Sequence, residues 1–374
     1  MKILLFSKKR KKNTKICKKM HFCAEEQMSR KKIGALPRKL KYKILAGVCD
    51  KFSIKLHDDV YFVKFNRGSW DDDTLELNDI AEVFSNYFLN SLGVENVQYK
   101  LASIGDKDVV VSKSFISKDV KYERTFSDMV TLYLFQKKYG NKYDVSTFFE
   151  KKQIDLCMNE LRKIVKEGEN PNSVEFILDV VQKVCETNEI EFDKSQLKHD
   201  LCKQVLVDYF MSNFDRHANN VTFLFKENGG KLKCELAPLF DHGYAFGIAD
   251  YPMSLYYVSQ VGISKESQKK SIDTFFHKPL QSGDLFLSEL INAVSEDDSL
   301  QMLAKGCREM NIDRLIEKFE GEEQEEIPVS HKERIKSTFE KRCEDWDRVS
   351  NLLKENGKDY VKETMNKEED YEFL

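Results

Sequence analysis

Two short motifs on either side of a predicted β-hairpin constrain the fold of this chain more than any other feature. The first, Asn-Phe-Asp-Arg-His-Ala-Asn-Asn at residues 213–220, follows a long segment with helical apolar periodicity. The second, Leu-Ala-Pro-Leu-Phe-Asp-His-Gly at residues 236–243, follows a strand-like stretch, residues 221–236, that turns at Gly229-Gly230. The order of helix, polar loop, hairpin and acidic loop predicts a fold that mixes helices and strands.

The polar residues of these motifs have the spacing of a phosphoryl-transfer site. Asp215 is followed five residues later by Asn220, and Asp241 lies just beyond the hairpin. In such sites one Asp accepts the proton of the acceptor hydroxyl, while an Asn and a second Asp hold magnesium ions. The first motif alone is equally typical of a turn, because Asp, Asn and His side chains bond nearby backbone groups. The second motif favours chemistry, and the spacing selects Asn220 rather than Asn219 as the metal ligand.

A Lys earlier in the chain can supply the cation that such a site needs, and a Glu can hold that Lys in place. Lys64 lies in the β-branched and aromatic run of residues 60–65, and Glu82 lies in a helix predicted at residues 77–92. In kinases a strand Lys paired with a helix Glu holds the nucleotide phosphates. Taken singly, each residue also fits a position on the surface. A loop with a single glycine, residues 45–53, comes before them and can present backbone N–H groups to phosphate.

The remaining pattern predicts a β-rich region followed by a helical one. Further strands are expected at residues 52–56, 97–103 and 108–115. Helices are expected at residues 125–138, 153–166, 173–185, 196–213, 284–294, 298–310, 312–320 and 331–355. Residues 242–282 are expected to form a long loop, and the acidic residues 320–326 a solvated linker.

Charge is distributed unevenly along the 374 residues, a length that suits two lobes. Residues 1–43 carry sixteen Lys and Arg against two Glu, although the net charge of the chain is −3. Such basic segments stay disordered or bind polyanions. We expect residues 1–32 to be a disordered, solvated tail. The alternatives are a tail that binds nucleic acid or an anionic membrane, and a true start at Met20 or Met28.

Cysteine usage and hydropathy indicate the compartment. The nine cysteines include no C-x-x-C pair and are odd in number, which argues against a disulfide framework and predicts free thiols in a reducing compartment. No apolar run approaches the roughly 18–20 residues that cross a bilayer. The run from Leu4 to Phe6 is too short for a signal-peptide core. These features predict a cytoplasmic protein.

Five regions, in order, resemble motifs of the HipA-like serine/threonine kinases, within the wider protein-kinase-like superfamily. Residues 45–54 are similar to the Gly-Val-Gln-x-Lys-Leu-Ser loop of that family, with Cys49 where Gln is usual. Residues 63–65 are similar to its ATP-binding Lys strand, and residues 81–94 to its Asn-Glu…Leu-Gly-Leu helix. The two opening motifs are similar to its Asp-Gly-His-Ala-Lys-Asn and Leu-Thr-Pro-Phe-Tyr-Asp motifs. The resemblance spans residues 43–247.

The resemblance implies an α+β, bilobal, protein-kinase-like fold. Residues 33–116 would form a small β-rich N-lobe with one αC-type helix, and residues 117–374 a large, mostly helical C-lobe. It also implies an ATP- and Mg²⁺-dependent kinase that phosphorylates Ser or Thr of a protein. The resemblance implies that the catalytic residues are Asp215, as base, together with His217, Lys64 and Glu82. It implies that ATP is bound by Gly47, Val48, Lys51, Lys64, Lys113 and Phe115, of which the last two lie in a hinge against adenine at residues 112–115. It implies that Asn220 and Asp241 bind the metal.

His217 and Arg216 leave the acceptor open. The sequence Asp-Arg-His-x-x-Asn also occurs in phosphoinositide kinases, so a lipid or small-molecule kinase is the first alternative. His217 is expected to position the catalytic loop or stabilise the transferring phosphoryl group, and a purely structural His fits equally. A catalytically silent nucleotide-binding module is the second alternative, although the complete set of acidic and basic site residues argues against it.

The chain departs from the toxin-type members of the family. The Ser that is autophosphorylated before the loop glycine is absent, and residues 44–46 read Ile-Leu-Ala. Only about forty residues precede the loop, where those members carry an additional N-terminal subdomain. Both differences argue against self-inactivation at the loop and against an antitoxin-like partner, and favour a compact, stand-alone kinase.

Overall fold

The chain divides into two units. The computed structural model describes residues 2–6, 17–21, 31–33, 42–45, 51–56, 59–65, 77–104, 107–149, 153, 174–213, 215–216, 218–248 and 283–356. The first unit consists of Met1–Phe115, Pro238–Tyr251 and Met310–Thr338, and the second of Ile116–Ala237, Pro252–Glu309 and Phe339–Leu374. The lobe bounds given above, residues 33–116 and 117–374, stay a prediction from the sequence.

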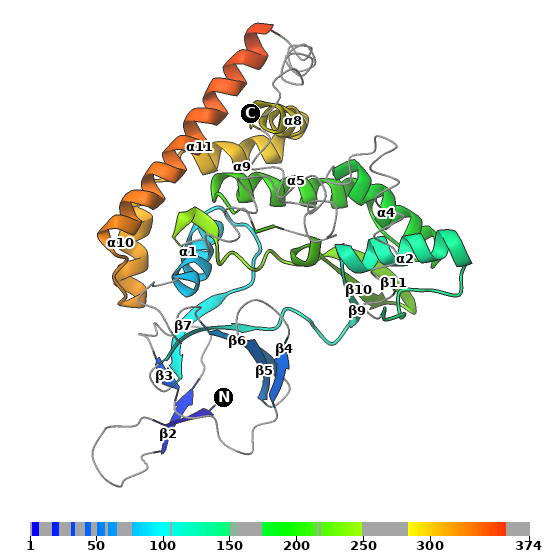
Figure 1. The fold of residues 1–374 in the computed structure, drawn as a ribbon, viewed down its shortest axis with the longest axis horizontal. Coiled ribbons are helices and arrows are strands. Elements are labelled where there is room, and N and C mark those ends of the chain that lie inside the picture. Colours follow the sequence, from blue (N-terminus) through cyan, green and yellow to red (C-terminus); the bar gives the residue numbers. More distant parts are fainter. Residues whose placement is uncertain are drawn as a thin grey trace, which may run out of the picture. The chain divides into compact units, whose positions relative to one another are not determined.

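A six-stranded sheet forms the core of the first unit (Figure 1). Its order is β3-β7-β8-β6-β5-β4, antiparallel except for the β3–β7 pair. The strands are β3 (Lys31–Ile33), β4 (Tyr42–Leu45), β5 (Lys51–Leu56), β6 (Asp59–Phe65), β7 (Tyr99–Ile104) and β8 (Lys107–Lys113). Residues Val63 and Val111 pair across β6 and β8 in an apolar cluster. Because side chains alternate along a strand, Lys64 points to the opposite face.

Helix α1 (Asn78–Ser91) packs against β7 and β8. Its apolar residues Ile80, Phe84 and Phe88 recur at helical spacing and are almost completely buried. The helix ends where Gly93, with φ of 68°, adopts a left-handed conformation that glycine tolerates without strain. The N–H of Val94 then donates back to the carbonyl of Leu89 at 2.9 Å. Both the helix and its end lie close to the predicted residues 77–92.

Strands occur in the N-terminal region, where the sequence predicted a disordered tail. Strand β1 (Lys2–Phe6) pairs antiparallel with β2 (Cys17–His21), and β3 lies in the large sheet. The physical reason for β1 lies in the apolar run that follows Lys2, since β-branched and aromatic residues favour strands. The basic run from Lys8 to Lys12, on which the alternative of polyanion binding depends, is outside the described residues.

The second unit contains a three-stranded sheet, β11-β10-β9. Strands β10 (Thr222–Asn228) and β11 (Lys231–Leu236) form the predicted hairpin. Its two-residue turn has φ of 60° at Gly229 and 84° at Gly230, which is the backbone that a tight hairpin requires. Strand β9 (Val120–Thr125) pairs with β10 and was not predicted, because its alternating polar sequence contains few apolar residues.

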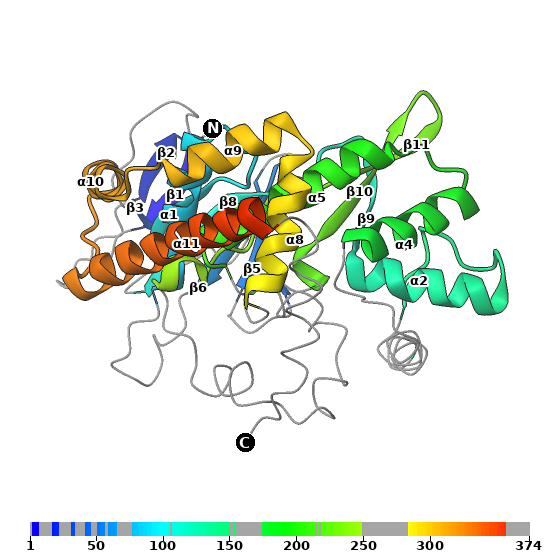
Figure 2. The same cartoon turned by 90° about the horizontal axis from the view of Figure 1, so that it is seen from above.

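Five helices with described bounds belong to the second unit. They are α2 (Phe126–Tyr139), α4 (Val174–Thr187), α5 (Lys194–Phe210), α8 (Gly283–Ser295) and α9 (Asp298–Arg308). Helix α2 starts at a capping box in which Thr125 and Asp128 bond each other's backbone N–H. Helices α2 and α4 pack together beside β9, β10 and β11 in both views (Figures 1 and 2). Apart from Gln153, the helix predicted at residues 153–166 is outside the described part of the chain.

Two helices complete the described fold. Helix α10 (Ile312–Glu323) belongs to the first unit, and α11 (Val329–Asn356) begins there and continues into the second. The prediction of a solvated linker at residues 320–326 is wrong at its start, because α10 runs to Glu323. Its carboxylates also have partners: Glu320 accepts from the N–H of Ile327 at 2.7 Å and pairs with Lys332.

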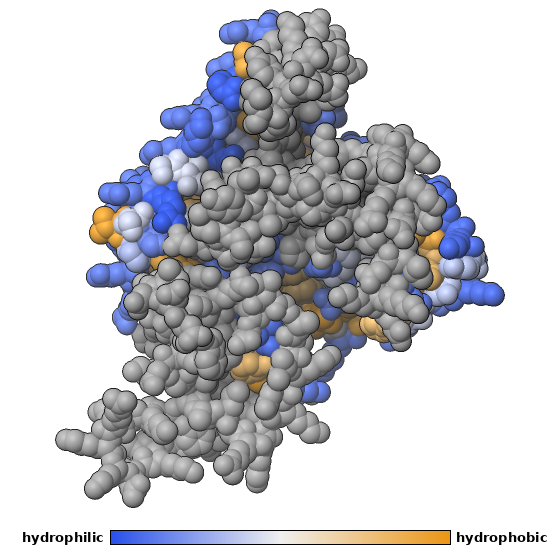
Figure 3. Space-filling model, viewed as in Figure 1, coloured by the Kyte–Doolittle hydropathy of each residue, from blue (hydrophilic) through white to orange (hydrophobic). Residues whose placement is uncertain are grey.

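The described surface of α11 is mostly hydrophilic on the face that Figure 3 shows. In the described part of the chain, no helix combines the length and the apolar character needed to cross a membrane.

Candidate active site

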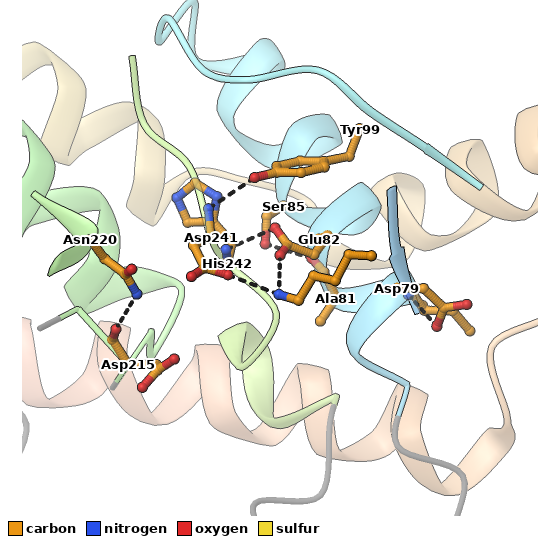
Figure 4. A network of polar contacts seen from close by, with 11 residues as sticks. Asp79, Ala81, Glu82, Ser85, Tyr99, Asp215, Asn220, Asp241 and His242 are labelled. Carbon is orange, nitrogen blue, oxygen red and sulfur yellow. Dashed lines mark hydrogen bonds and ion pairs between the residues drawn. The ribbon is translucent and has the colours of Figure 1, made fainter. Parts of the chain in front are cut away.

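Lys64 is the centre of a charged cluster in the first unit. Its two carboxylate partners, Glu82 and Asp241, are labelled in Figure 4. Its ammonium lies 2.8 Å from Oε1 of Glu82 on α1 and 2.8 Å from Oδ1 of Asp241. The Lys64 side chain is 20 % exposed and that of Asp241 28 % exposed, whereas that of Glu82 is 1 % exposed. The cluster therefore reaches the surface on the side of Asp241 and Lys64 and is anchored by the buried Glu82.

Glu82 uses both carboxylate oxygens. Oε1 accepts from Lys64, and Oε2 accepts from the backbone N–H of His242 at 2.9 Å. Burial raises the pKa of Glu82, and the nearby Lys64 opposes that shift. A buried carboxylate is tolerated only when it is paired and hydrogen-bonded, and both conditions are met here.

Asp241 has a left-handed backbone, with φ of 60°. Such a conformation is uncommon outside glycine, although Asp adopts it more readily than most residues. The N–H of Asp241 donates to the phenol oxygen of Tyr99, at the start of β7, at 3.1 Å. Burial of this hydroxyl, followed by the charges of Glu82 and Asp241, raises the pKa of Tyr99 well above its usual value, so the phenol keeps its proton. Tyr99 was not predicted as a site residue.

Gly243 closes the cluster. A Cβ at this position would lie 3.2 Å from Nζ of Lys64 and 3.5 Å from Oε1 of Glu82. A larger residue would therefore require the ammonium to shift by a few tenths of an ångström. The glycine of the second motif is explained by this close approach of backbone to side chain.

The described residues of the first motif, 213, 215–216 and 218–220, follow α5 in the second unit, and Ala218–Asn220 form a short 3-10 helix. Arg216 is buried and donates through Nε and an Nη atom to both oxygens of Asp208, at 2.8 and 3.1 Å. Its other Nη atom donates to the carbonyl of Asn220 at 2.8 Å. Asn213 also donates to Asp208, at 2.8 Å. Asp208 was not predicted, although a charged residue at the apolar end of α5 is a signal of a buried partner.

The ends of this loop are tied together by Asn220 (Figure 4). Its Nδ2 donates to the carbonyl of Asp215 at 2.9 Å. Because the nitrogen is used in this way, the side-chain oxygen of Asn220 is the atom that suits a cation. Asn220 is buried and the neighbouring Asn219 is exposed, as the spacing argument expected for Asn219.

The structure groups the predicted residues into two sets. The first unit brings together Lys64, Glu82 and Asp241, and the second brings together Asp215 and Asn220. Lys51 lies in β5, opposite Lys64 in the register of β5 and β6. Gly47, Val48 and His217 are outside the described residues.

The predicted adenine hinge lies at the end of β8. The exposed Lys113 pairs with Asp59 at 2.9 Å, and the ring of Phe115 lies 5.5 Å from that of Phe240. The N–H of Ser114 donates to the carbonyl of Val60 at 2.8 Å and is therefore used within the unit.

No protein-family model matches the sequence, and no curated protein is similar to it in sequence. Among solved structures, the proinflammatory kinase CtkA of Helicobacter pylori is similar, with a TM-score of 0.50 and 15 % identity over 86 % of this chain and 98 % of that one. The chain has a protein-kinase-like fold. The predicted α+β class is confirmed, with a small sheet unit and a mostly helical unit.

Two further structures are similar at lower scores. HipA of Shewanella oneidensis MR-1, solved with HipB and operator DNA, has a TM-score of 0.46 and 14 % identity over 82 % of this chain and 66 % of that one. The aminoglycoside phosphotransferase APH(4)-Ia has a TM-score of 0.23 and 10 % identity over 76 % of this chain and 95 % of that one. The kinase-like fold assignment rests on CtkA.

Each unit carries one candidate oxygen donor for magnesium. Among the described residues, no group of three or more His, Cys, Asp or Glu side chains could hold a metal ion by itself. Magnesium is usually held by one or two protein oxygens, with phosphates and water completing its coordination. The carboxylate of Asp241 and the amide oxygen of Asn220 are donors of this kind.

Proposed function

We propose that this protein is an ATP- and Mg²⁺-dependent phosphotransferase that transfers the γ-phosphate to an alcohol group. The observation that carries the proposal is the position of Lys64 between Glu82 and Asp241, at 2.8 Å from each. A kinase requires a Lys that is held by a helix Glu and lies beside a metal-binding Asp. A purely structural ion pair would not need two carboxylates around one partly exposed Lys. It would also not need a glycine, Gly243, at the position where the backbone approaches the Lys64 ammonium closely.

Each set of residues would have a defined task. Lys64 would bind the nucleotide phosphates, and Glu82 would keep its ammonium in place. Asp241 and Asn220 would hold Mg²⁺, which when bound neutralises charge on the phosphates. Asp215 would orient the acceptor hydroxyl and accept its proton. The ion pair of Arg216 with Asp208 would keep the loop of Asp215 rigid, because it is buried and bidentate.

We favour Ser or Thr of a protein as the acceptor, on the resemblance to the HipA-like kinases. The lipid-kinase alternative was based on Arg216 and His217 next to Asp215, and His217 is outside the described residues. Since the guanidinium of Arg216 bonds Asp208 and the backbone of Asn220, its identity follows from local structure and carries no information about the acceptor. An antitoxin-like partner, and binding of nucleic acid or a membrane by residues 1–32, stay predictions from the sequence.

The proposal is tested by transfer of radiolabel from ATP, with Mg²⁺, to a mixed protein substrate and to lipid vesicles. We expect Asp241→Ala and Asp215→Asn each to lower the rate by at least about 100-fold, since each removes a group that acts on the reacting atoms. The matched control is Asn219→Ala, an exposed neighbour of Asn220, which should leave the rate unchanged. Transfer by Asp241→Ala at the wild-type rate would refute the role of Asp241. ATP binding without transfer by the wild type would identify a silent nucleotide-binding module.

A further inference from the structure

We propose that Tyr99 is a positioning residue for the metal ligand Asp241, which it orients through the backbone. The inference rests on the proposed function, because it concerns the residue that would hold Mg²⁺. Tyr99 does not contact Lys64 or Glu82 by any hydrogen bond found among the described residues. Its phenol oxygen instead accepts the N–H of Asp241 at 3.1 Å.

Tyr99 is itself fixed by its neighbours. Its backbone carbonyl accepts from Nδ2 of Asn86 on α1 at 3.1 Å. Just before it, the N–H of Val97 donates to the carbonyl of Leu239 at 2.8 Å, and the N–H of Leu239 lies 3.4 Å from the carbonyl of Glu95. The chain that leads into Tyr99 and the chain that leads into Asp241 therefore run side by side, and the phenol is the last of a series of contacts between them.

Asp241 needs such a contact because of its backbone conformation. A residue other than glycine with φ of 60° persists when the surrounding structure holds it there. Two successive N–H groups are held at this point, that of Asp241 by Tyr99 and that of His242 by Glu82. Together they fix the peptide groups on both sides of the Asp241 Cα, and so set the direction of its carboxylate.

Replacement of Tyr99 by Phe keeps the ring and removes the acceptor. The N–H of Asp241 then loses its partner, and an unpaired amide favours rotation of the peptide group towards another acceptor. We expect the carboxylate of Asp241 to lose its fixed direction, while Lys64 and Glu82 keep their ion pair. Metal binding should therefore weaken more than nucleotide binding, whereas general destabilisation would affect both.

The test is calorimetric titration of Mn²⁺ into protein saturated with a non-hydrolysable ATP analogue. We expect Tyr99→Phe to bind Mn²⁺ about tenfold more weakly than wild type, the effect of losing one buried hydrogen bond. Binding of the analogue in EDTA should be unchanged, and amide hydrogen exchange at residues 238–243 should be faster. The matched control is Tyr209→Phe, since the phenol of the buried Tyr209 bonds the carbonyl of Arg342 at 2.9 Å in the second unit.

Unchanged Mn²⁺ affinity in Tyr99→Phe, or equal weakening in Tyr209→Phe, would overturn the inference. If Tyr99→Phe folds poorly, Tyr99→para-aminophenylalanine replaces it, because its amine has a lone pair where the phenol oxygen was. This variant should recover part of the Mn²⁺ affinity of wild type. Absence of that recovery also overturns the inference. Asp241→Ala in the same titration separates the two proposals. If Asp241→Ala loses Mn²⁺ binding while Tyr99→Phe keeps the wild-type affinity, only the role of Tyr99 is rejected. If Asp241→Ala binds Mn²⁺ like wild type, the metal-binding role of Asp241 is rejected.

Discussion

Glu82 shows how much a single buried side chain can fix. Its two oxygens hold the Lys64 ammonium and the His242 amide, which belong to segments far apart in the sequence. A neutral amide side chain has only one acceptor atom, so it cannot serve both donors in the same way. The charge of Glu82 and its second oxygen are therefore both required.

We predict that Glu82→Gln lowers kcat/KM for phosphoryl transfer by about 100-fold, because one of the two donors then faces an NH₂ group. Steady-state kinetics with varied ATP measure the effect. The control is Glu95→Gln, an exposed residue shortly after α1, which should behave as wild type. Wild-type kinetics in Glu82→Gln would show that Lys64 needs no anchor.

The sequence was sufficient to predict Glu82 as the partner of Lys64, but neither the ion pair of Lys64 with Asp241 nor the residues that orient this cluster. The order of strand Lys, helix Glu and loop Asp is readable from local patterns. The contact of Tyr99 with Asp241 joins residues 142 positions apart, and no local pattern marks a phenol as an acceptor. Asp208 could be suspected only because it interrupts an apolar stretch of α5.

At the scale of elements, α1 is held from two sides. One side packs on β7 and β8, and the other meets α10. The ring of Phe319 on α10 is completely buried and lies 5.9 Å from that of Phe84 and 5.6 Å from that of Tyr87. The Tyr87 hydroxyl also lies within hydrogen-bond distance of the carboxylates of Glu322 and Glu323, at 3.0 and 2.9 Å. Helix α10 thus stabilises the helix that carries Glu82.

We predict that Phe319→Ala destabilises the first unit by about 3–5 kcal/mol, the usual cost of emptying a buried Phe site. Amide exchange along α1 should accelerate. The matched control is Phe223→Ala, which removes an equally buried ring in the second unit and should leave exchange in α1 unchanged. Equal acceleration in both variants would contradict a specific role for α10.

Elements with strong periodicity were predicted well, and elements defined by tertiary partners were not. Strands β5 and β6, helix α1 and the β10–β11 hairpin lie within a few residues of their predicted bounds. Strand β9 was missed because its pairing with β10 joins distant parts of the sequence. Helix α10 extends to Glu323, three residues further than predicted, and the hydroxyl of Tyr87 on α1 lies 2.9 Å from the carboxylate of Glu323 at that end.

At the scale of the molecule, the first unit is discontinuous. It needs residues 310–338 in addition to its sheet and the loop of Asp241. We predict that a chain ending at residue 309 loses nucleotide binding and shows fast amide exchange along α1, because Phe84 loses its contact with Phe319. A chain ending at Asn356 keeps α10 and α11 and is the control. Nucleotide binding by the shorter chain at wild-type affinity would contradict the prediction.

This discontinuity also sets the order in which the site can form during synthesis. Lys64 and Asp241 are 177 residues apart, so at typical ribosome speeds Lys64 waits roughly 10–35 s for its second partner. The face of α1 that receives Phe319 waits longer still. A nascent chain therefore exposes an incomplete first unit for most of its translation. The Lys64 part of the cluster is synthesised early but is completed only when Asp241 has been added.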